Sequence, residues 1–407
     1  YAKPKAHAAA GPAAEETVQA ADRILADLAS KGDAAAAKAA AAGLLRTLAE
    51  QDKPTGDLVL AARTLRLVVL VGDAGKAGAT PAAKSGVKEA SGEGAKESGG
   101  VGGVARLVGM LKESPAVADA LAWAYVPGKD RAGEVLKIVG ELRDAGGPVE
   151  KYPELAAAIA VVHDMKDPRA QKWSPGPVEL FEYYTDPRQR LLMPVDALPG
   201  VLLVHLVDCV VSREEMGWAY GQYRSNARVG VHYKEVRYDT PFFKGQQPKK
   251  MDGQDYTLRN ILKFGGVCVE QAYFAEMIGK AIGVPTATVT ARGDSVGHAW
   301  IGYLMKQNRG WAWDLTEGRY DEYEGEQADV VDPQTGASIT DAELQMKADR
   351  ASMSPELVRE SLARADAAAV MSEPQAALAM MERAVNACPY VPAAWERMAE
   401  LAGKKKL

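Results

Sequence analysis

Cysteine is scarce in this chain, and its scarcity excludes two kinds of small scaffold. The 407 residues include only three cysteines, Cys209, Cys268 and Cys388, and no two of them form a CxxC pair. Disulfide-rich domains and zinc ribbons both need several closely spaced cysteines, so the sequence argues against both. We therefore expect neither a resident metal ion nor a cofactor.

Long apolar runs are also missing. The two best, residues 58–71 and 198–211, are interrupted by charged residues. A membrane-spanning helix needs about 20 mostly apolar residues, so we expect no membrane span and a soluble protein. Charge is nearly balanced, with 49 basic against 54 acidic side chains. This balance gives no electrostatic reason to expect nucleic acid as a partner.

The remaining composition is that of a globular protein. Apolar residues make up 47% and charged residues 25% of the chain, and the length suggests about two to four domains. The chain starts at Tyr1 with an Ala/Pro-rich stretch, which suits the mature end of an exported, periplasmic or secreted protein after signal cleavage. A trimmed start and a cytoplasmic protein are the alternatives.

Composition changes along the chain predict five regions. The expected regions are a helical part over 1–73, a Gly/Ala/Ser-rich linker over 74–103, a helical part over 104–175, a domain over 176–330 and a helical part over 331–407. The domain over 176–330 is richer in aromatic and β-branched residues, which favour strands and pockets. Residues 373–401 resemble a tetratricopeptide-type helical hairpin, which would offer a protein partner a surface. An ordinary helical cap is the alternative.

One segment, residues 265–285, combines a turn, a helix and a cysteine. Gly265 and Gly266 allow a tight turn, and a helix is expected from there to Gly283. Cys268 then lies in the first helical turn, where unpaired N–H groups and the helix dipole favour a thiolate. The N–H groups of Val267 and Cys268 are candidates to bind an oxyanion formed when that sulfur attacks an acyl group.

Three strands are expected after this helix. Their ranges are 286–292, 298–305 and 311–316, and the short connections predict an antiparallel meander. His298 opens the second strand and Asp314 lies late in the third, so the hairpin is expected to bring them together. A thiol, an imidazole and a carboxylate are the parts of a nucleophile–base–orienter triad.

The order of these residues resembles the transglutaminase-like superfamily of cysteine enzymes. The matching residues are Gly266-Val267-Cys268, Ala272, Gly283-Val284-Pro285, His298-Ala299-Trp300, Gly310-Trp311 and Asp314. The resemblance implies an α+β protein with a papain-like core, flanked here by helical N- and C-terminal regions. It implies Cys268 as nucleophile, His298 as general base and acid, and Asp314 as the residue that orients the imidazole. Family members supply an oxyanion donor from an upstream Trp or Gln, for which Trp218 and Gln222 are candidates, and Trp300 is a candidate to line a substrate groove.

The expected function is cysteine-dependent acyl transfer on amide bonds of a protein or peptide. Peptide or isopeptide hydrolysis is preferred by analogy with bacterial members that carry helical appendages. Cross-linking of glutamine side chains to amines is one alternative. A helical protein-interaction module around a catalytically silent core is the other.

Overall fold

The computed structural model describes residues 12–77, 101–292, 297–308 and 310–404. The chain forms two compact units. The first unit contains residues 1–140 and 353–407, and the second contains residues 141–352. The second unit is therefore an insertion between two parts of the first.

The first unit is helical where it is described. Its helices are α1 (Glu15–Lys31), α2 (Ala34–Glu50), α3 (Thr55–Ala77), α4 (Val101–Glu113), α5 (Pro115–Ala124), α15 (Pro355–Val370), α16 (Pro374–Ala387) and α17 (Pro392–Lys404), and α6 (Ala132–Asp144) crosses into the second unit. Local signals set the helix starts, because Asp33 caps α2 by accepting from the Ala36 N–H at 2.9 Å, and Ser354 caps α15.

One apolar core joins the two separated parts of the first unit. Leu45 and Leu58 from α2 and α3 pack in a single cluster with Ala367 of α15 and Met380 of α16. Small alanines let the helices approach closely, as expected for residues 373–401, where α16 and α17 do form consecutive helices. The tetratricopeptide assignment stays a prediction.

The predicted linker over 74–103 falls mostly on residues 78–100, which lie outside the described residues. Residues 74–77 belong to the end of α3, and residues 101–103 belong to the start of α4. Both helices thus extend into the range that the composition assigned to the linker.

The second unit contains both helices and a sheet, which confirms the α+β class. Its helices are α7 (Pro153–Val162), α8 (Pro177–Thr185), η2 (Val195–Ala197), α9 (Gly200–Val207), α10 (Arg213–Tyr223), η3 (Val229–Glu235), α11 (Thr240–Phe243), α12 (Leu258–Phe264), α13 (Cys268–Ala281), η4 (Asp321–Tyr323) and α14 (Asp341–Ala351). The unit extends beyond the predicted 176–330 domain on both sides, because α7 packs on α8 and α9 while α14 packs on β3.

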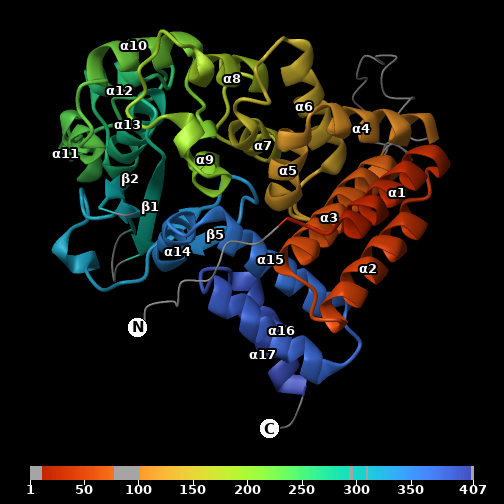
Figure 1. Ribbon diagram of the computed structural model, residues 1–407. Coiled ribbons are helices and arrows are strands. Elements are labelled where there is room, and N and C mark those ends of the chain that lie inside the picture. Colours follow the sequence, from red (N-terminus) through yellow and green to blue (C-terminus); the bar gives the residue numbers. More distant parts are fainter. Residues whose placement is uncertain (1–11, 78–100, 293–296, 309, 405–407) are drawn as a thin grey trace, which may run out of the picture. The chain divides into compact units, whose positions relative to one another are not determined.

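The sheet has five antiparallel strands in the order β3-β2-β1-β4-β5. Figure 1 labels β1, β2 and β5. The strands are β1 (Thr286–Arg292), β2 (Gly297–Gln307), β3 (Gly310–Asp314), β4 (Asp329–Val331) and β5 (Ser338–Thr340). The predicted meander of three strands is confirmed. Strands β4 and β5 were not predicted, since each is only three residues long and the alternation in such a short run carries little signal.

Helix α13 packs against β1 and β2 and against η3. Thr286 and Thr288 mark the face of the sheet that looks toward α13, because both hydroxyls donate to Glu276, at 2.7 and 2.6 Å. Every second residue of each strand shares this face. Within the described ranges, no helix is both long and apolar enough to cross a membrane.

Candidate functional site

A tight turn places Cys268 at the first position of α13. Gly265 has a φ of +82°, and a Cβ atom at this position would lie 2.4 Å from the carbonyl oxygen of Arg237. Only glycine fits both constraints. The side chain of Glu270 then accepts from the Val267 N–H at 2.9 Å, which satisfies one of the unpaired donors at the helix start. The predicted helix start at Cys268 is confirmed.

The segment before this turn is held against it by backbone contacts. Tyr238 forms a bridge with Gly266, whose N–H donates to the Arg237 carbonyl at 3.1 Å and whose carbonyl accepts from the Asp239 N–H at 2.8 Å. Glu270 is almost fully buried and binds the Lys249 ammonium at 2.6 Å. These contacts fix Tyr238 and its neighbours beside the start of α13.

Cys268 differs from the other two cysteines in its exposure. Its side chain is half-buried, whereas Cys209 and Cys388 are buried, as expected for small apolar residues. Burial raises the pKa of the Cys209 thiol to about 12. Cys268 is therefore the cysteine that a solvent-borne reagent or substrate can reach.

Four tyrosines lie near Cys268 or His298: Tyr233, Tyr238, Tyr320 and Tyr323, here called the tyrosine cluster. Burial raises the pKa of Tyr233, Tyr238 and Tyr323. Glu322 raises the pKa of Tyr323 further, and a charge on the nearby Cys268 adds to the rise in all three. Tyr238 reaches about 12. The hydroxyls of Tyr233, Tyr238 and Tyr323 therefore stay protonated near neutral pH, and that of Tyr233 donates to the Ala299 carbonyl at 2.9 Å.

His298 lies at the end of the sheet, as the second residue of β2. Its Nε2 atom lies 2.7 Å from the carbonyl oxygen of Gly318. Because a carbonyl can only accept, Nε2 carries the hydrogen, and Nδ1 is the basic nitrogen of the neutral ring. The ring stacks on Tyr320 and Tyr323, with centroid distances of 4.2 and 5.1 Å. Burial lowers the pKa of His298, against the opposing effects of the Gly318 carbonyl and Glu322.

Asp314 is not placed where the sequence predicted. It pairs with Tyr303 across β2 and β3, so both side chains lie on the sheet face toward α13. His298 is five residues from Tyr303 on an unbroken strand and therefore points to the other face. The contact expected between Asp314 and the imidazole is replaced by the bond from Nε2 to the Gly318 carbonyl.

The carboxylate of Asp314 instead holds the end of the hairpin. It accepts from the Tyr303 hydroxyl at 2.8 Å and from the Thr316 hydroxyl and N–H at 2.6 and 3.0 Å. Burial pushes the pKa of Asp314 up, but the hydrogen bonds from Thr316 and Tyr303 outweigh this effect and lower it. Through its bonds to Thr316, Asp314 thus fixes the conformation of the segment that leads to Gly318.

The remaining predicted residues lie in different surroundings. Trp218 is half-buried in α10, next to the Tyr223 ring and the Arg259 guanidinium, while Gln222 is exposed on the same helix. Val267 is the residue before α13, as predicted, and its N–H is bound by Glu270. Trp300 is fully buried and its Nε1–H donates to the Leu315 carbonyl at 2.9 Å, so this tryptophan packs in the core.

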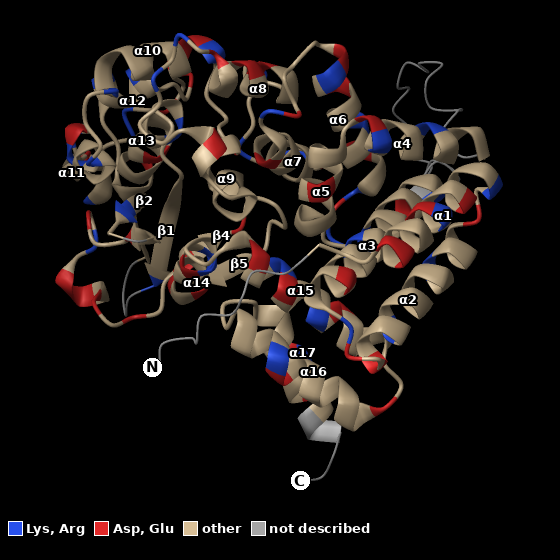
Figure 2. Ribbon diagram, viewed as in Figure 1, with Lys and Arg blue, Asp and Glu red and all other residues tan. Residues whose placement is uncertain are grey.

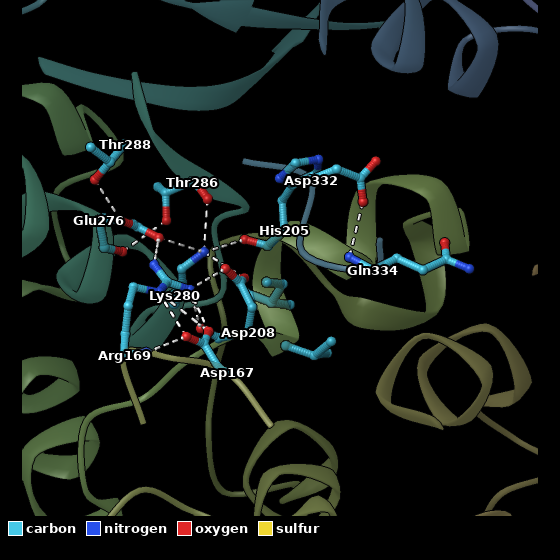
Figure 3. A network of polar contacts seen from close by, with 12 residues as sticks. Asp167, Arg169, His205, Asp208, Glu276, Lys280, Thr286, Thr288, Asp332 and Gln334 are labelled. Atoms are coloured by element: carbon cyan, nitrogen blue, oxygen red, sulfur yellow. Dashed lines mark hydrogen bonds and ion pairs between the residues drawn. The ribbon is translucent and has the colours of Figure 1, made fainter. Parts of the chain in front are cut away.

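A buried ionic network lies behind the other end of α13 (Figure 3). The ammonium of Lys280, 0% exposed, binds Asp208 at 2.6 Å and Glu276 at 3.2 Å. Arg169 joins the same carboxylates, with 2.9 Å to Asp208 and 3.0 Å to Glu276, and also binds Asp167. The network ties the helix of Cys268 to α9 and to the segment before α8.

Sequence reasoning missed this network. A signal was present, because Glu276 and Lys280 are charged residues four positions apart on a helix whose other side chains are mostly buried. Their partners lie about 70 and 110 residues earlier in the chain, so no local pattern identifies them.

The best-formed cavity lies away from Cys268 and His298. A cavity of about 460 Å³ lies beside α8, lined by Phe181, Asp186, Arg188 and neighbours, and neither Cys268 nor His298 lines it. In the part of the chain that the structure describes, no three His, Cys, Asp or Glu side chains gather in a way that could hold a metal ion.

Comparisons with family models, with curated proteins and with solved structures find no match to this chain. The resemblance to transglutaminase-like enzymes therefore rests on the order and spacing of the motif residues alone.

Proposed function

We propose that this chain is a cysteine-dependent enzyme that transfers acyl groups from amide bonds, with peptide or isopeptide hydrolysis as its reaction. The observation that carries the proposal is the position of Cys268: half-exposed, at the first residue of a 14-residue helix, beside the tyrosine cluster that also contacts His298. A helix start favours the thiolate, and accessibility lets an amide carbonyl approach it.

The chemical steps follow from these groups. Nδ1 of His298 takes the proton of the Cys268 thiol, and the sulfur attacks the amide carbonyl carbon. The imidazolium then protonates the departing amine as the C–N bond breaks, which leaves a thioester on Cys268. Water attacks the thioester, with His298 again as base, and the acid is released. Attack by an amine instead would give transamidation.

The orienting role belongs to the Gly318 carbonyl in this proposal. It binds Nε2 and so leaves Nδ1 free to act as base, which is the task of a carboxylate in most triads. His298 points to the sheet face opposite to the one that packs on α13, so the proposal requires the imidazole to move until Nδ1 reaches Sγ of Cys268. Tyr320 and Tyr323, which stack on the imidazole, are the side chains that such a movement would displace.

A second candidate is an interaction module with a silent core. Two observations favour it: Asp314 holds the hairpin, and His298 is only 7% exposed. In this case, the helices of the first unit would bind a protein partner, and Trp395, which is 43% exposed on α17, is a candidate contact.

One experiment separates these functions. The protein is incubated with a mixed peptide library and a fluorescent primary amine, and the products are read by mass spectrometry. Cleavage supports hydrolysis, and amine incorporation supports transamidation. The Cys268→Ala variant must abolish either product. A library left unchanged by folded wild-type protein, with alkylation of Cys268 no faster than that of a free cysteine peptide, would favour the silent core.

A further inference from the structure

Exposed apolar side chains lie near the start of α13 and near His298. Among the described residues of the second unit, the large hydrophobic side chains that remain exposed are Phe243, Val269, Tyr320 and Val331, at 55, 45, 48 and 65%. Three of these four lie near the start of α13 or near His298. Val269 follows Cys268, Phe243 contacts Tyr238 edge-on at 5.7 Å, and Tyr320 stacks on His298. Exposed apolar groups concentrated at one place mark a binding surface.

The segment on the Tyr238 side of this surface is basic. Residues 236–250 contain four basic side chains and one acidic side chain, Asp239, which is 1% exposed. Lys249 and Lys250 form ion pairs with Glu270 and Asp239. Arg237 and Lys244 are exposed, so they present positive charge next to Tyr238 and Phe243.

The segment on the Tyr320 side is acidic. Residues 318–329 contain five acidic side chains and one basic side chain, Arg319. Arg319 turns inward, where its guanidinium donates to the Tyr323 and Glu326 carbonyls at 2.8 and 2.7 Å. Asp321, Glu322, Glu324 and Glu326 are exposed. The charges of both segments can be followed in Figure 2 around α11 and in the loop that leads to β4.

The basic segment therefore lies beside the start of α13, through the bridge between Tyr238 and Gly266, and the acidic segment begins beside the imidazole, where Tyr320 stacks on His298. Each segment exposes one large apolar side chain, Phe243 or Tyr320. A charged ligand would be attracted to the segment of opposite charge and repelled by the segment of like charge, so the surface favours one orientation of the bound ligand. One peptide can match the basic segment, the acidic segment and the apolar side chains together. Such a peptide has a large apolar residue at the reacting amide, acidic residues on one side of it and basic residues on the other.

We propose that the Cys268 site takes a polypeptide segment of this kind, with acidic residues toward Arg237 and Lys244 and basic residues toward Asp321 and Glu322. This inference rests on the proposed function, since it assumes that the segment reacts at Cys268. The occupant is a peptide rather than a small amine or acid, because only an extended chain spans the two charged segments.

The test measures binding in the Cys268→Ala protein, so that no turnover is needed. Three fluorescent peptides share a central Gly-Phe-Gly: one has two glutamates before it and two lysines after it, one has the reverse order, and one has serines at all four positions. We expect one charged order to bind about tenfold more tightly than its reverse at low salt, and this preference to fade at about 0.5 M NaCl.

Charge-reversal variants test whether the basic and acidic segments cause this preference. Lys244→Glu and Glu322→Lys should each reduce the ratio of the affinities for the two charged peptides by about fivefold or more. Phe243→Ala should weaken the binding of all three peptides by about tenfold. Lys172→Glu makes the same charge change on the segment of Arg169, near the other end of α13, and should leave the preference intact. Circular dichroism confirms that each variant is folded.

The outcomes separate this inference from the proposed function. Equal binding of the two charged peptides, or a preference that survives both Lys244→Glu and Glu322→Lys, overturns the inference. A preference that depends on these residues supports it, even where the wild-type protein cleaves none of the peptides, in which case the acyl-transfer proposal alone fails.

Discussion

Tyr303 and Asp314 face each other across β2 and β3, and the tyrosine hydroxyl donates a 2.8 Å hydrogen bond to the carboxylate. This pairing turns Asp314 into a structural residue at the hairpin end, on the opposite sheet face from His298. The first prediction follows from it.

Asp314→Ala should reduce stability more than chemistry. The substitution leaves the Tyr303 hydroxyl and both Thr316 donors without their acceptor, and we expect a loss of about 1–3 kcal/mol in the free energy of unfolding. The alkylation rate of Cys268 and any turnover should fall less than about tenfold, against about 10³–10⁴ for a triad carboxylate. Urea titration and steady-state rates check both. A loss of a thousandfold in folded protein would restore Asp314 as the orienting residue.

Cys268 should react with iodoacetamide far faster than the other cysteines. Cys209 is buried and burial raises its pKa to about 12, so only about one part in 10⁴ is thiolate at pH 8. The native protein is alkylated for set times, and peptide mass spectrometry then measures the labelled fraction of each cysteine. Equal labelling of Cys209 before unfolding would show that the described burial does not hold in solution.

Lys280→Met should be strongly destabilising. The substitution leaves Asp208 and Glu276 buried with Arg169 as their remaining cation, and breaking a buried ion pair in this way costs about 3–5 kcal/mol. Lys172→Met, an exposed lysine on the segment that contains Arg169, is the matched control and should change stability by less than about 0.5 kcal/mol. Urea unfolding of the three proteins provides the comparison. Similar stability of the two variants would contradict the role of the network.

Acid should weaken the same network. Burial pushes the pKa of Glu276 up, but Lys280 and Arg169 outweigh burial and hold it below its ordinary value of 4.5. A lowered folded-state pKa stabilises the protein above the unfolded value, and this contribution is lost as pH falls from 4.5 toward the folded pKa. The stability difference between wild type and Glu276→Gln should therefore narrow between pH 7 and about pH 3.5. Glu182→Gln, on an exposed part of α8, should show no such narrowing.

Gly265→Ala should disturb the position of Cys268. The residue has a φ of +82°, and the new Cβ would lie 2.4 Å from a backbone oxygen. Gly245→Ala is a matched control, since its φ is +67° but nothing lies within 4 Å of the added Cβ. We expect the control to lose about 1 kcal/mol from strain and Gly265→Ala to lose more, together with a changed alkylation rate of Cys268. Equal effects on stability and labelling would show that the close approach is not needed.

The parts of the site that depend on local sequence could be predicted. The glycine pair before Cys268, the helix that follows and the three strands of the meander all have signals within a few residues. Asp314 shows the limit of that reasoning. Its distance from His298 along the chain resembles that in transglutaminase-like enzymes. The sheet face that Asp314 occupies depends on the register of the β2–β3 hairpin, where a shift of one residue exchanges the faces.

Long-range features could not be predicted from the sequence. The partners of Lys280 come from separate segments, and β4 pairs with β1 through only two residue pairs. The C-terminal helices α15 and α16 likewise join α2 and α3 in one core, although some 300 residues separate Arg66 from its ion-pair partner Asp366. Such contacts have no periodicity or spacing to reveal them.

The insertion of residues 141–352 between the two parts of the first unit sets an order for folding during synthesis. The N-terminal helices leave the ribosome long before α15 and α16 exist, so their shared core stays incomplete while the inserted unit is made. The inserted unit has all of its strands and helices by residue 352 and can fold first. A chain released after residue 352 would therefore expose Leu45 and Leu58 to chaperones, whereas the segment that carries Cys268 would already resist proteases.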